Sequence, residues 1–256
     1  MTLDEVLALA GELDYDGIEP RSDGNQRHGV EISTNAEQRR VIRERAAAAG
    51  VELCCIATSI TYANPQTVAE QIEHSHRCID LCGDIGSPRL RVFGGALPQG
   101  VTREQAVIQV AAALREVADH AVEWGVTVCI ETHDDWSDPV HLAAVMERVA
   151  HPAVAINWDF IHPWRVGYTV AESFAIVRPW IGHVHVHDGY KDEAGHLQAT
   201  WIGARAVDHR AAMQLLRSIA YDGYLSGEWI GREPGYAEHL PRELATLRGY
   251  AAATQN

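Results

Sequence analysis

Short apolar runs alternate with longer mixed segments from one end of the chain to the other. The runs are rich in β-branched residues and are bounded by turn-forming residues, a pattern typical of strands. Seven segments fit this pattern: 16–21, 52–58, 89–94, 126–132, 153–159, 182–187 and 224–230. The intervals between them leave room for a helix after each strand, as a parallel sheet requires.

The segments between these strands carry helix signals, beginning with the first ~11 residues, which lead directly into strand 16–21. Helix starts are predicted where a capping residue can accept hydrogen bonds from the free amides of a first turn. The predicted starts are Thr34 with Glu37, Thr102 with Gln105, Asp138 before Pro139, Thr169 with Glu172, and Asp208. Gly50 and Gly125 mark two predicted helix ends.

Strand–helix alternation without a linker or a change in composition predicts one α/β domain over residues 1–256. This length and a parallel sheet are typical of a TIM (β/α)8-type barrel. Seven strands are one short of such a barrel, so we expect it to lack or shorten its first strand, or to close that edge otherwise. An open edge favours pairing with another chain. The irregular segment 188–207 is expected to cover the rim.

Four of the predicted strands end in a residue that can bind a divalent metal ion: Glu131, Asp159, His185 and Glu228. The carboxyl ends of parallel strands meet at one rim of a barrel, so these side chains are expected to converge. Three carboxylates and one imidazole favour Mn²⁺, Mg²⁺ or Co²⁺ over a structural zinc ion. Each carboxylate alone could be a paired rim charge, but four such residues in register predict one metal site.

The formal net charge of the chain disfavours one class of partner, the nucleic acids. A formal net charge of −14 at pH 7 opposes binding to the phosphate backbone of nucleic acids. No run approaches the ~20 apolar residues of a membrane span, and the amino terminus lacks signal-peptide features. The five cysteines are an odd number and complete no metal-binding pattern, so we expect buried, reduced thiols in a cytoplasmic protein.

Four motifs in this chain resemble those of the sugar phosphate isomerase/epimerase superfamily, the xylose isomerase-like TIM barrels (AP endonuclease family 2). They are Ile130-Glu131-Thr132-His133, Asn157-Trp158-Asp159-Phe160-Ile161-His162-Pro163-Trp164-Arg165, His183-Val184-His185-Val186-His187-Asp188 and Ser226-Gly227-Glu228-Trp229. The resemblance covers nearly the whole chain. It implies that Glu131, Asp159, His185 and Glu228 ligate one divalent ion, with Glu131 and Glu228 also acting as acid and base. His183 is then expected to be a hydrogen-bonded interior residue.

Six residues near these motifs are candidates for substrate binding: His133, His162, Arg165, His187, Lys191 and Arg205. The resemblance implies substrate contact by His162, and His133 could move a proton or bind a hydroxyl group. Arg165 could clamp an anionic oxygen of the substrate or form a surface ion pair. Lys191 stands where the similar ketose epimerases carry an arginine. This difference weakens the inference that this chain acts on the same substrates as those epimerases. Arg205 adds a positive charge at the rim and suggests an anionic substrate.

The resemblance implies a divalent-metal-dependent isomerase or epimerase that acts on a ketose or related keto-sugar through an enediolate. The same chemistry serves a lyase, such as a dehydratase or decarboxylase of a keto-sugar, inosose or keto-acid, and this alternative stays open. A non-catalytic accessory barrel is a third hypothesis. A nuclease is disfavoured, because it would need several metal ions and a basic surface. We expect a small carbohydrate substrate, no nucleic-acid or membrane partner, and, as in relatives, a homo-oligomer.

Overall fold

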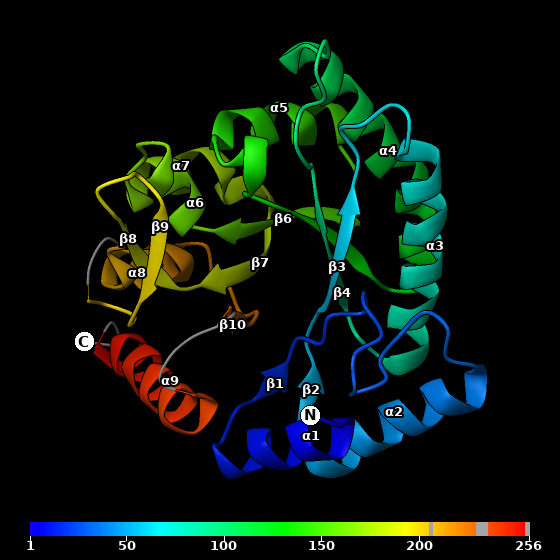
Figure 1. The fold of residues 1–256 in the computed structure, drawn as a ribbon, viewed down its shortest axis with the longest axis vertical. Helices are drawn as coiled ribbons and strands as arrows, with labels where there is room; N and C mark the ends of the chain where they lie inside the picture. Colours follow the sequence, from blue (N-terminus) through cyan, green and yellow to red (C-terminus); the bar gives the residue numbers. More distant parts are fainter. Residues whose placement is uncertain (205–206, 229–234, 254–256) are drawn as a thin grey trace.

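The computed structural model describes residues 1–204, 207–228 and 235–253, and it shows a curled parallel sheet with helices packed around its outer face (Figure 1). Six strands form the main wall in the order β10-β7-β6-β5-β4-β3. Their bounds are Ile56–Thr61 (β3), Arg89–Phe93 (β4), Thr127–Glu131 (β5), Val154–Asp159 (β6), Ile181–Val186 (β7) and Leu225–Gly227 (β10). The predicted α/β class with a parallel sheet is confirmed.

The predicted strand 16–21 is much shorter than expected. Only Gly17–Ile18 (β1) pairs with Glu52–Leu53 (β2), and a single bridge joins Arg21 to Ala57 of β3. Pro20 has no amide with which to continue the ladder, so the strand ends early. The predicted strand 52–58 is correspondingly divided between β2 and the start of β3. These features agree with a barrel that is shortened at its first strand.

The helices alternate with the strands along the chain. Their bounds are Leu3–Glu12 (α1), Ala36–Ala49 (α2), Val68–Ile85 (α3), Arg103–Glu123 (α4), Pro139–Val149 (α5), Ile161–Arg165 (α6), Val170–Val177 (α7), His209–Ser218 (α8) and Tyr236–Ala253 (α9). Two short 3-10 turns are Asp134–Trp136 (η1) and Arg178–Trp180 (η2). Within the described ranges, no helix is both long enough and apolar enough to cross a membrane.

Most of the predicted helix starts are confirmed. The confirmed N-cap residues are Thr102, Asp138, Thr169 and Asp208. The predicted pair of Thr34 and Glu37 is wrong by one residue, because Asn35 caps α2 and forms the reciprocal hydrogen bonds with Gln38. The Thr34 hydroxyl instead donates to the Glu31 carbonyl at 2.6 Å. Thr34 therefore stabilises the preceding turn rather than the helix.

The segment 188–207 is more ordered than expected, because it contains an antiparallel hairpin of Asp188–Lys191 (β8) and Leu197–Thr200 (β9). The Asp192 carboxylate accepts hydrogen bonds from two amides within the turn, which stabilises the reversal of the chain. At the base of the hairpin, the Asp188 carboxylate accepts a hydrogen bond from the Gly203 amide at 3.0 Å. Asp188 thus organises a loop above the sheet.

The two faces of the central strands have different side chains. On β6, Trp158 packs against Phe160 and Phe174 in the apolar layer between sheet and helices. The alternate positions of β5, β6 and β7 are polar and buried: Glu131, Asn157, Asp159, His183 and His185. Burial of charged groups is costly unless they are paired or bind a cation. The candidate chemistry is therefore concentrated at the carboxyl end of these strands.

Candidate metal and catalytic site

The ends of neighbouring strands bring the four predicted ligands together. Glu131 ends β5, Asp159 ends β6, His185 lies one residue before the end of β7, and Glu228 follows β10 directly. The strand register places Asp159 beside His185. One ligand atom from each of the four residues lies within 4.8 Å of the others. The first three are buried and Glu228 is half-buried.

The two carboxylate oxygens of Glu131 have different surroundings. Oε2 accepts a hydrogen bond from Asn157 Nδ2 at 3.2 Å and lies 3.2 Å from Nε of Arg91. Oε1 is buried and has no hydrogen-bond partner among the described residues. Burial raises the pKa of Glu131, although the charges of His185 and Arg91 oppose this. One oxygen is therefore held in place while the other is free to bind a ligand.

His185 also has one bonded and one unbonded atom. Its Nε2 hydrogen bonds to both oxygens of Glu19, at 3.0 and 3.1 Å. Its Nδ1 is buried without a hydrogen-bond partner in the described ranges and lies 3.6 Å from Glu131 Oε2. Burial alone would lower the pKa of His185, but the carboxylates of Glu19 and Glu131 outweigh it and raise this pKa to about 10. The surroundings therefore favour a positive charge at this position.

The Asp159 carboxylate is held by its own loop and by a neighbouring imidazole. Oδ1 accepts a hydrogen bond from the Ile161 amide at 3.1 Å, and Oδ2 lies 2.7 Å from Nε2 of His187. Burial alone would raise the pKa of Asp159, but the nearby rings of His187 and His162 outweigh it and lower this pKa. Asp159 is therefore a charged carboxylate in a fixed orientation.

These donor atoms fit one divalent metal ion. Buried polar atoms in proteins are normally hydrogen-bonded, so the unpartnered Glu131 Oε1 and His185 Nδ1 require an explanation. A cation bound among these residues would satisfy both atoms, and Asp159 and Glu228 would supply further oxygen ligands. Three carboxylates with one imidazole suit Mg²⁺, Mn²⁺ or a similar ion.

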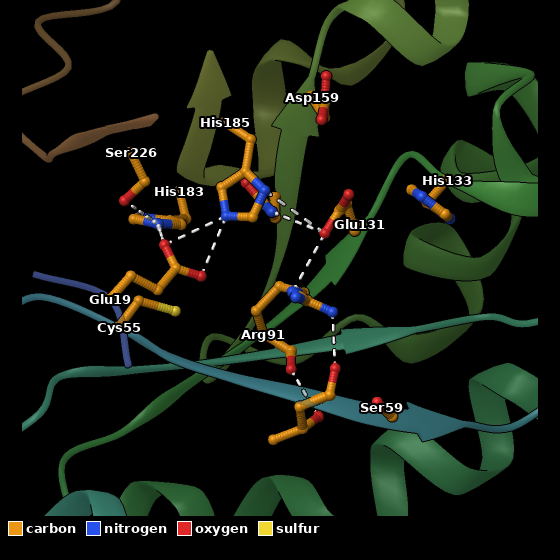
Figure 2. A network of polar contacts seen from close by, with 12 residues as sticks. Glu19, Cys55, Ser59, Arg91, Glu131, His133, Asp159, His183, His185 and Ser226 are labelled. Atoms are coloured by element: carbon orange, nitrogen blue, oxygen red, sulfur yellow. Dashed lines mark hydrogen bonds and ion pairs between the residues drawn. The ribbon is translucent and has the colours of Figure 1, made fainter. Parts of the chain in front are cut away.

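Glu19 is part of this network, and the sequence analysis missed it. Its carboxylate lies between the rings of His183 and His185 (Figure 2) and is 2.9 Å from Nε2 of His183. Burial alone would raise the pKa of Glu19, but the two histidines outweigh it and hold this pKa well below its usual value. The available signal is that Glu19 lies near the end of the predicted strand 16–21, directly before Pro20. The expectation that His183 is a hydrogen-bonded interior residue is confirmed.

Arg91 is a second residue that the sequence analysis missed. Its side chain is buried beside Glu131, and its Nη1 donates to the Thr58 carbonyl at 2.6 Å. The guanidinium carbon lies 4.1 Å above the centre of the Phe93 ring. The available signal was an arginine in the middle of the predicted strand 89–94, because a buried cation needs a nearby anion. Arg91 orients Glu131 and partly balances the negative charge of the site.

Three of the predicted substrate-binding residues form a wall of imidazoles beside Asp159. The ring centres of His133 and His162 are 4.2 Å apart, and those of His162 and His187 are 5.8 Å apart. Burial lowers the pKa of His162 to about 3, so this ring is neutral. The exposed Arg165 lies beside it, with 3.0 Å between Arg165 Nη1 and His162 Nδ1. The structure thus places these three histidines and Arg165 near the four predicted metal ligands.

The other two predicted substrate-binding residues are not part of this arrangement. Lys191 is exposed on the β8–β9 hairpin, and its Nζ lies 5.9 Å from the centre of the Trp164 ring. Arg205 lies outside the described residues, as does Trp229 of the last motif.

Comparisons with known proteins agree with the barrel fold described above. A family model described as a xylose isomerase-like TIM barrel matches residues 7–249. The chain is 23% identical over 185 residues to a 3-dehydroshikimate dehydratase from Bacillus anthracis, a match that covers 71% of this chain and 64% of that protein. It is 21% identical over 173 residues to a putative hydroxypyruvate isomerase from Xenopus laevis, with 60% and 58% covered. The matches thus span less than two thirds of these curated relatives.

The fold is also similar to that of a xylose isomerase-like TIM barrel protein from Mycobacterium smegmatis, solved in complex with magnesium. The TM-score is 0.75 at 19% sequence identity, and the match covers 98% of this chain and 89% of that one. This similarity supports the same fold.

Proposed function

Because the chain belongs to the xylose isomerase-like TIM-barrel family, we propose that it is an enzyme that binds one divalent metal ion and isomerises or epimerises a ketose or related keto-sugar. The family and the barrel fold are those that the sequence motifs predicted. The observation that carries the proposal is the convergence of Glu131, Asp159, His185 and Glu228 around two buried, unpartnered donor atoms.

The bound ion would polarise the carbonyl and the adjacent hydroxyl group of the substrate. This polarisation would lower the pKa of the C–H group on the carbon that bears this hydroxyl, next to the carbonyl. Glu131 and Glu228 then serve as base and acid, since an epimerase must remove a proton from one face of a carbon and return one to the other. Arg91 and Asn157 hold Oε2 of Glu131 and so fix the direction from which this carboxylate approaches. Fixed geometry of this kind lowers the entropic cost of proton transfer.

The imidazole wall of His133, His162 and His187 would bind the hydroxyl groups of the substrate. A neutral His162 can both donate and accept a hydrogen bond, which suits a polyol. Arg165 would act at the edge of the wall, and Lys191 and Arg205 would contribute positive charge at the rim if the substrate is anionic. The net charge of −14 supports a small-molecule substrate rather than a nucleic acid. A cytoplasmic homo-oligomer is the form we expect.

A lyase is the second candidate function, and the geometry of His133 favours it. Burial alone would lower the pKa of His133, but the Asp134 carboxylate at 2.8 Å outweighs it and raises this pKa. An imidazole held in this position could act as the acid that donates a proton to a departing hydroxyl group. Similarity to a dehydratase over part of the chain is compatible with this outcome.

Proton NMR in D₂O tests the proposal and separates the two candidates. The protein, with Mn²⁺ or Mg²⁺, would be added to a panel of ketoses, keto-sugars, inososes and keto-acids. Entry of deuterium at a carbon next to a carbonyl would establish enolisation. A product with an unchanged carbon skeleton and no loss of water or CO₂ identifies an isomerase or epimerase. Metal binding without exchange in any compound would contradict the proposal and favour an accessory barrel.

Chelation of the metal ion is expected to abolish turnover. After treatment with EDTA and dialysis, activity should be lost, and added Mn²⁺, Mg²⁺ or Co²⁺ should restore it. Free metal at 100 times its dissociation constant should also raise the free energy of unfolding by about 2.7 kcal/mol, measured by denaturant titration. The variant Asp159→Asn should lose most of this stabilisation. Full activity in the metal-free protein would refute the metal-dependent mechanism.

The variant Arg165→Ala is expected to raise KM about tenfold with a smaller effect on kcat, since Arg165 lies at the rim beside His162 rather than in the ligand cluster. The exposed Arg178→Ala is a matched control, because it also removes a surface guanidinium. Thermal denaturation should show that both variants remain folded. An unchanged KM in Arg165→Ala would make this residue a surface charge.

A further inference from the structure

Arg21 is a cation on the inner face of the barrel that the proposed reaction does not yet use. A parallel bridge joins Arg21 to Ala57 of β3, and Ala57 is in register with Arg91 of β4. Paired residues of neighbouring strands carry their side chains on the same face of a sheet. The side chain of Arg91 lies on the inner face beside Glu131, so that of Arg21 is directed to the same interior.

The hydroxyl of Ser59 holds the Arg21 guanidinium at the rim that carries the metal ligands. Nη2 of Arg21 donates a hydrogen bond to Oγ of Ser59, at 2.5 Å. Ser59 is exposed near the carboxyl end of β3, whereas Ile56 and Ile60 of the same strand are buried in the apolar core. Because helices cover the outer face of the sheet (Figure 1), the exposed Ser59 faces the mouth of the barrel.

The charge of Arg21 is not balanced by a carboxylate of the protein. Among the described residues, Arg21 forms no ion pair, and its one side-chain hydrogen bond is that to Ser59. The acidic residues closest to it in the sequence have other partners. Asp23 lies 3.6 Å from Nε2 of His74 on α3, and Glu19 is held between two histidines of β7. The exposed guanidinium therefore has N–H groups that can bind an anionic ligand.

The distance between Arg21 and the metal ligands is that of a small molecule. Arg91 spans this interval: its Nε lies 3.2 Å from Glu131, and its Nη1 donates to the carbonyl of Thr58, the residue before Ser59. Figure 2 shows Arg91 between β3 and Glu131 in this way. About one arginine side chain thus separates the two groups. A substrate bound to the metal ion at one end can reach Arg21 with a group several carbon atoms away.

We propose that Arg21 and Ser59 bind a terminal carboxylate of the substrate, which is therefore a keto-sugar acid: a ketose oxidised at the end remote from its carbonyl group. The guanidinium donates two hydrogen bonds to the carboxylate oxygens, and the Ser59 hydroxyl donates a third. This role of Arg21 rests on the proposed function, because the metal ion must hold the carbonyl end of the same molecule.

The surroundings of Arg21 fit a carboxylate better than a phosphate group. A phosphate ester carries a charge of about −1.5 to −2 at pH 7 and three acceptor oxygens. One guanidinium and one hydroxyl group match the single charge and two oxygens of a carboxylate. His28, which accepts the role of hydrogen-bonding the Arg21 backbone, adds no positive charge, because burial lowers the pKa of its ring.

Isothermal titration calorimetry on the Mn²⁺-loaded protein tests the proposal with two matched pairs of ligands. D-fructuronate differs from D-fructose, and D-tagaturonate from D-tagatose, only by a carboxylate in place of the terminal CH₂OH group. We expect at least one acid to bind about tenfold more tightly than its parent sugar. D-fructose 6-phosphate should bind more weakly than that acid. Equal binding within both pairs, or tighter binding of the phosphate ester, would overturn the proposal.

Variants of Arg21 locate the bound carboxylate. Arg21→Gln should abolish the preference for the acid, with unchanged affinity for the parent sugar and for Mn²⁺. Arg21→Lys should keep part of the preference, since an ammonium group lacks the two-point contact. The control Arg148→Gln, exposed in the last turn of α5, should bind every ligand as the wild type does. A preference that survives in Arg21→Gln would place the carboxylate elsewhere and overturn the proposal.

The same titrations separate failure of this proposal from failure of the proposed function. A wild-type protein that binds no Mn²⁺ would overturn the metal-dependent function, and the role of Arg21 with it. Mn²⁺ binding without any preference for the acids would overturn the role of Arg21 alone.

Discussion

Replacement of Glu228 by glutamine is expected to reduce kcat about 10³-fold while the protein remains folded. Removal of a general acid or base typically costs 10²–10⁴-fold in rate. Glutamine keeps the size of the side chain and one oxygen that can bind a metal ion, but it cannot exchange a proton near pH 7. Glu228 is half-buried after β10, so its charge contributes less to folding than that of the buried Glu131.

Two measurements separate loss of proton transfer from loss of the metal ion. Titration with Mn²⁺ should show that Glu228→Gln still binds the ion, with a reduction in affinity much smaller than the reduction in kcat. The exposed Glu123→Gln on α4 is the matched control and should retain full activity. If Glu228→Gln turns over at the wild-type rate, Glu228 has no acid–base role, and Glu131 with the imidazole wall must supply both proton transfers.

The four candidate metal ligands could be grouped together from the sequence because each lies at or near the carboxyl end of a predicted strand. Glu131, Asp159 and His185 follow apolar runs that are easily recognised, and parallel strands place their carboxyl ends at one rim whatever the register. Their convergence needs no knowledge of side-chain conformations. The same reasoning placed Glu228 after β10, although this strand has only three residues in the structure.

The groups that orient these ligands could not be predicted in this way. Glu19 contacts His183 and His185, which follow it by 164 and 166 residues, and this contact depends on the curl of the whole wall. The role of Arg91 depends on the rotamer that brings Nε to 3.2 Å from Glu131. Neither a strand pattern nor a motif contains this information. Both residues were visible as charges within predicted strands, 16–21 and 89–94, but the sequence did not indicate their partners.

Local sequence signals did not predict the correct structure where two conformations compete over a few residues. Thr34 and Asn35 are both good N-cap residues, and the choice was made by the hydroxyl of Thr34, which bonds to the preceding turn. The β8–β9 hairpin was missed because its strands have four residues each and are rich in polar residues. Short polar strands have little hydrophobic pattern, so tertiary contacts determine whether they form.

The second large effect is expected at Glu19, which holds His185 in the orientation that a metal ligand needs. Because Nε2 of His185 bonds to Glu19, Nδ1 is directed toward the carboxylates of the site. Loss of such a partner typically reduces metal affinity 10–100-fold. We expect Glu19→Gln to weaken Mn²⁺ binding about tenfold, since glutamine keeps an acceptor but loses the charge. Glu19→Ala should weaken it about 100-fold, and isothermal titration calorimetry measures both.

Glu31→Gln provides the control for Glu19, because Glu31 is also buried but accepts its hydrogen bond from the Gln26 amide, at 2.8 Å. It should leave metal affinity unchanged. The Mn²⁺ affinity of Glu19→Gln should be higher than that of Glu19→Ala. Such a change in affinity distinguishes an orienting role from simple stabilisation, because a merely structural residue would lower the thermal midpoint without changing the affinity of the folded protein. If both Glu19 variants bind Mn²⁺ as tightly as the wild type, the orientation of His185 must be determined by packing within β7 alone.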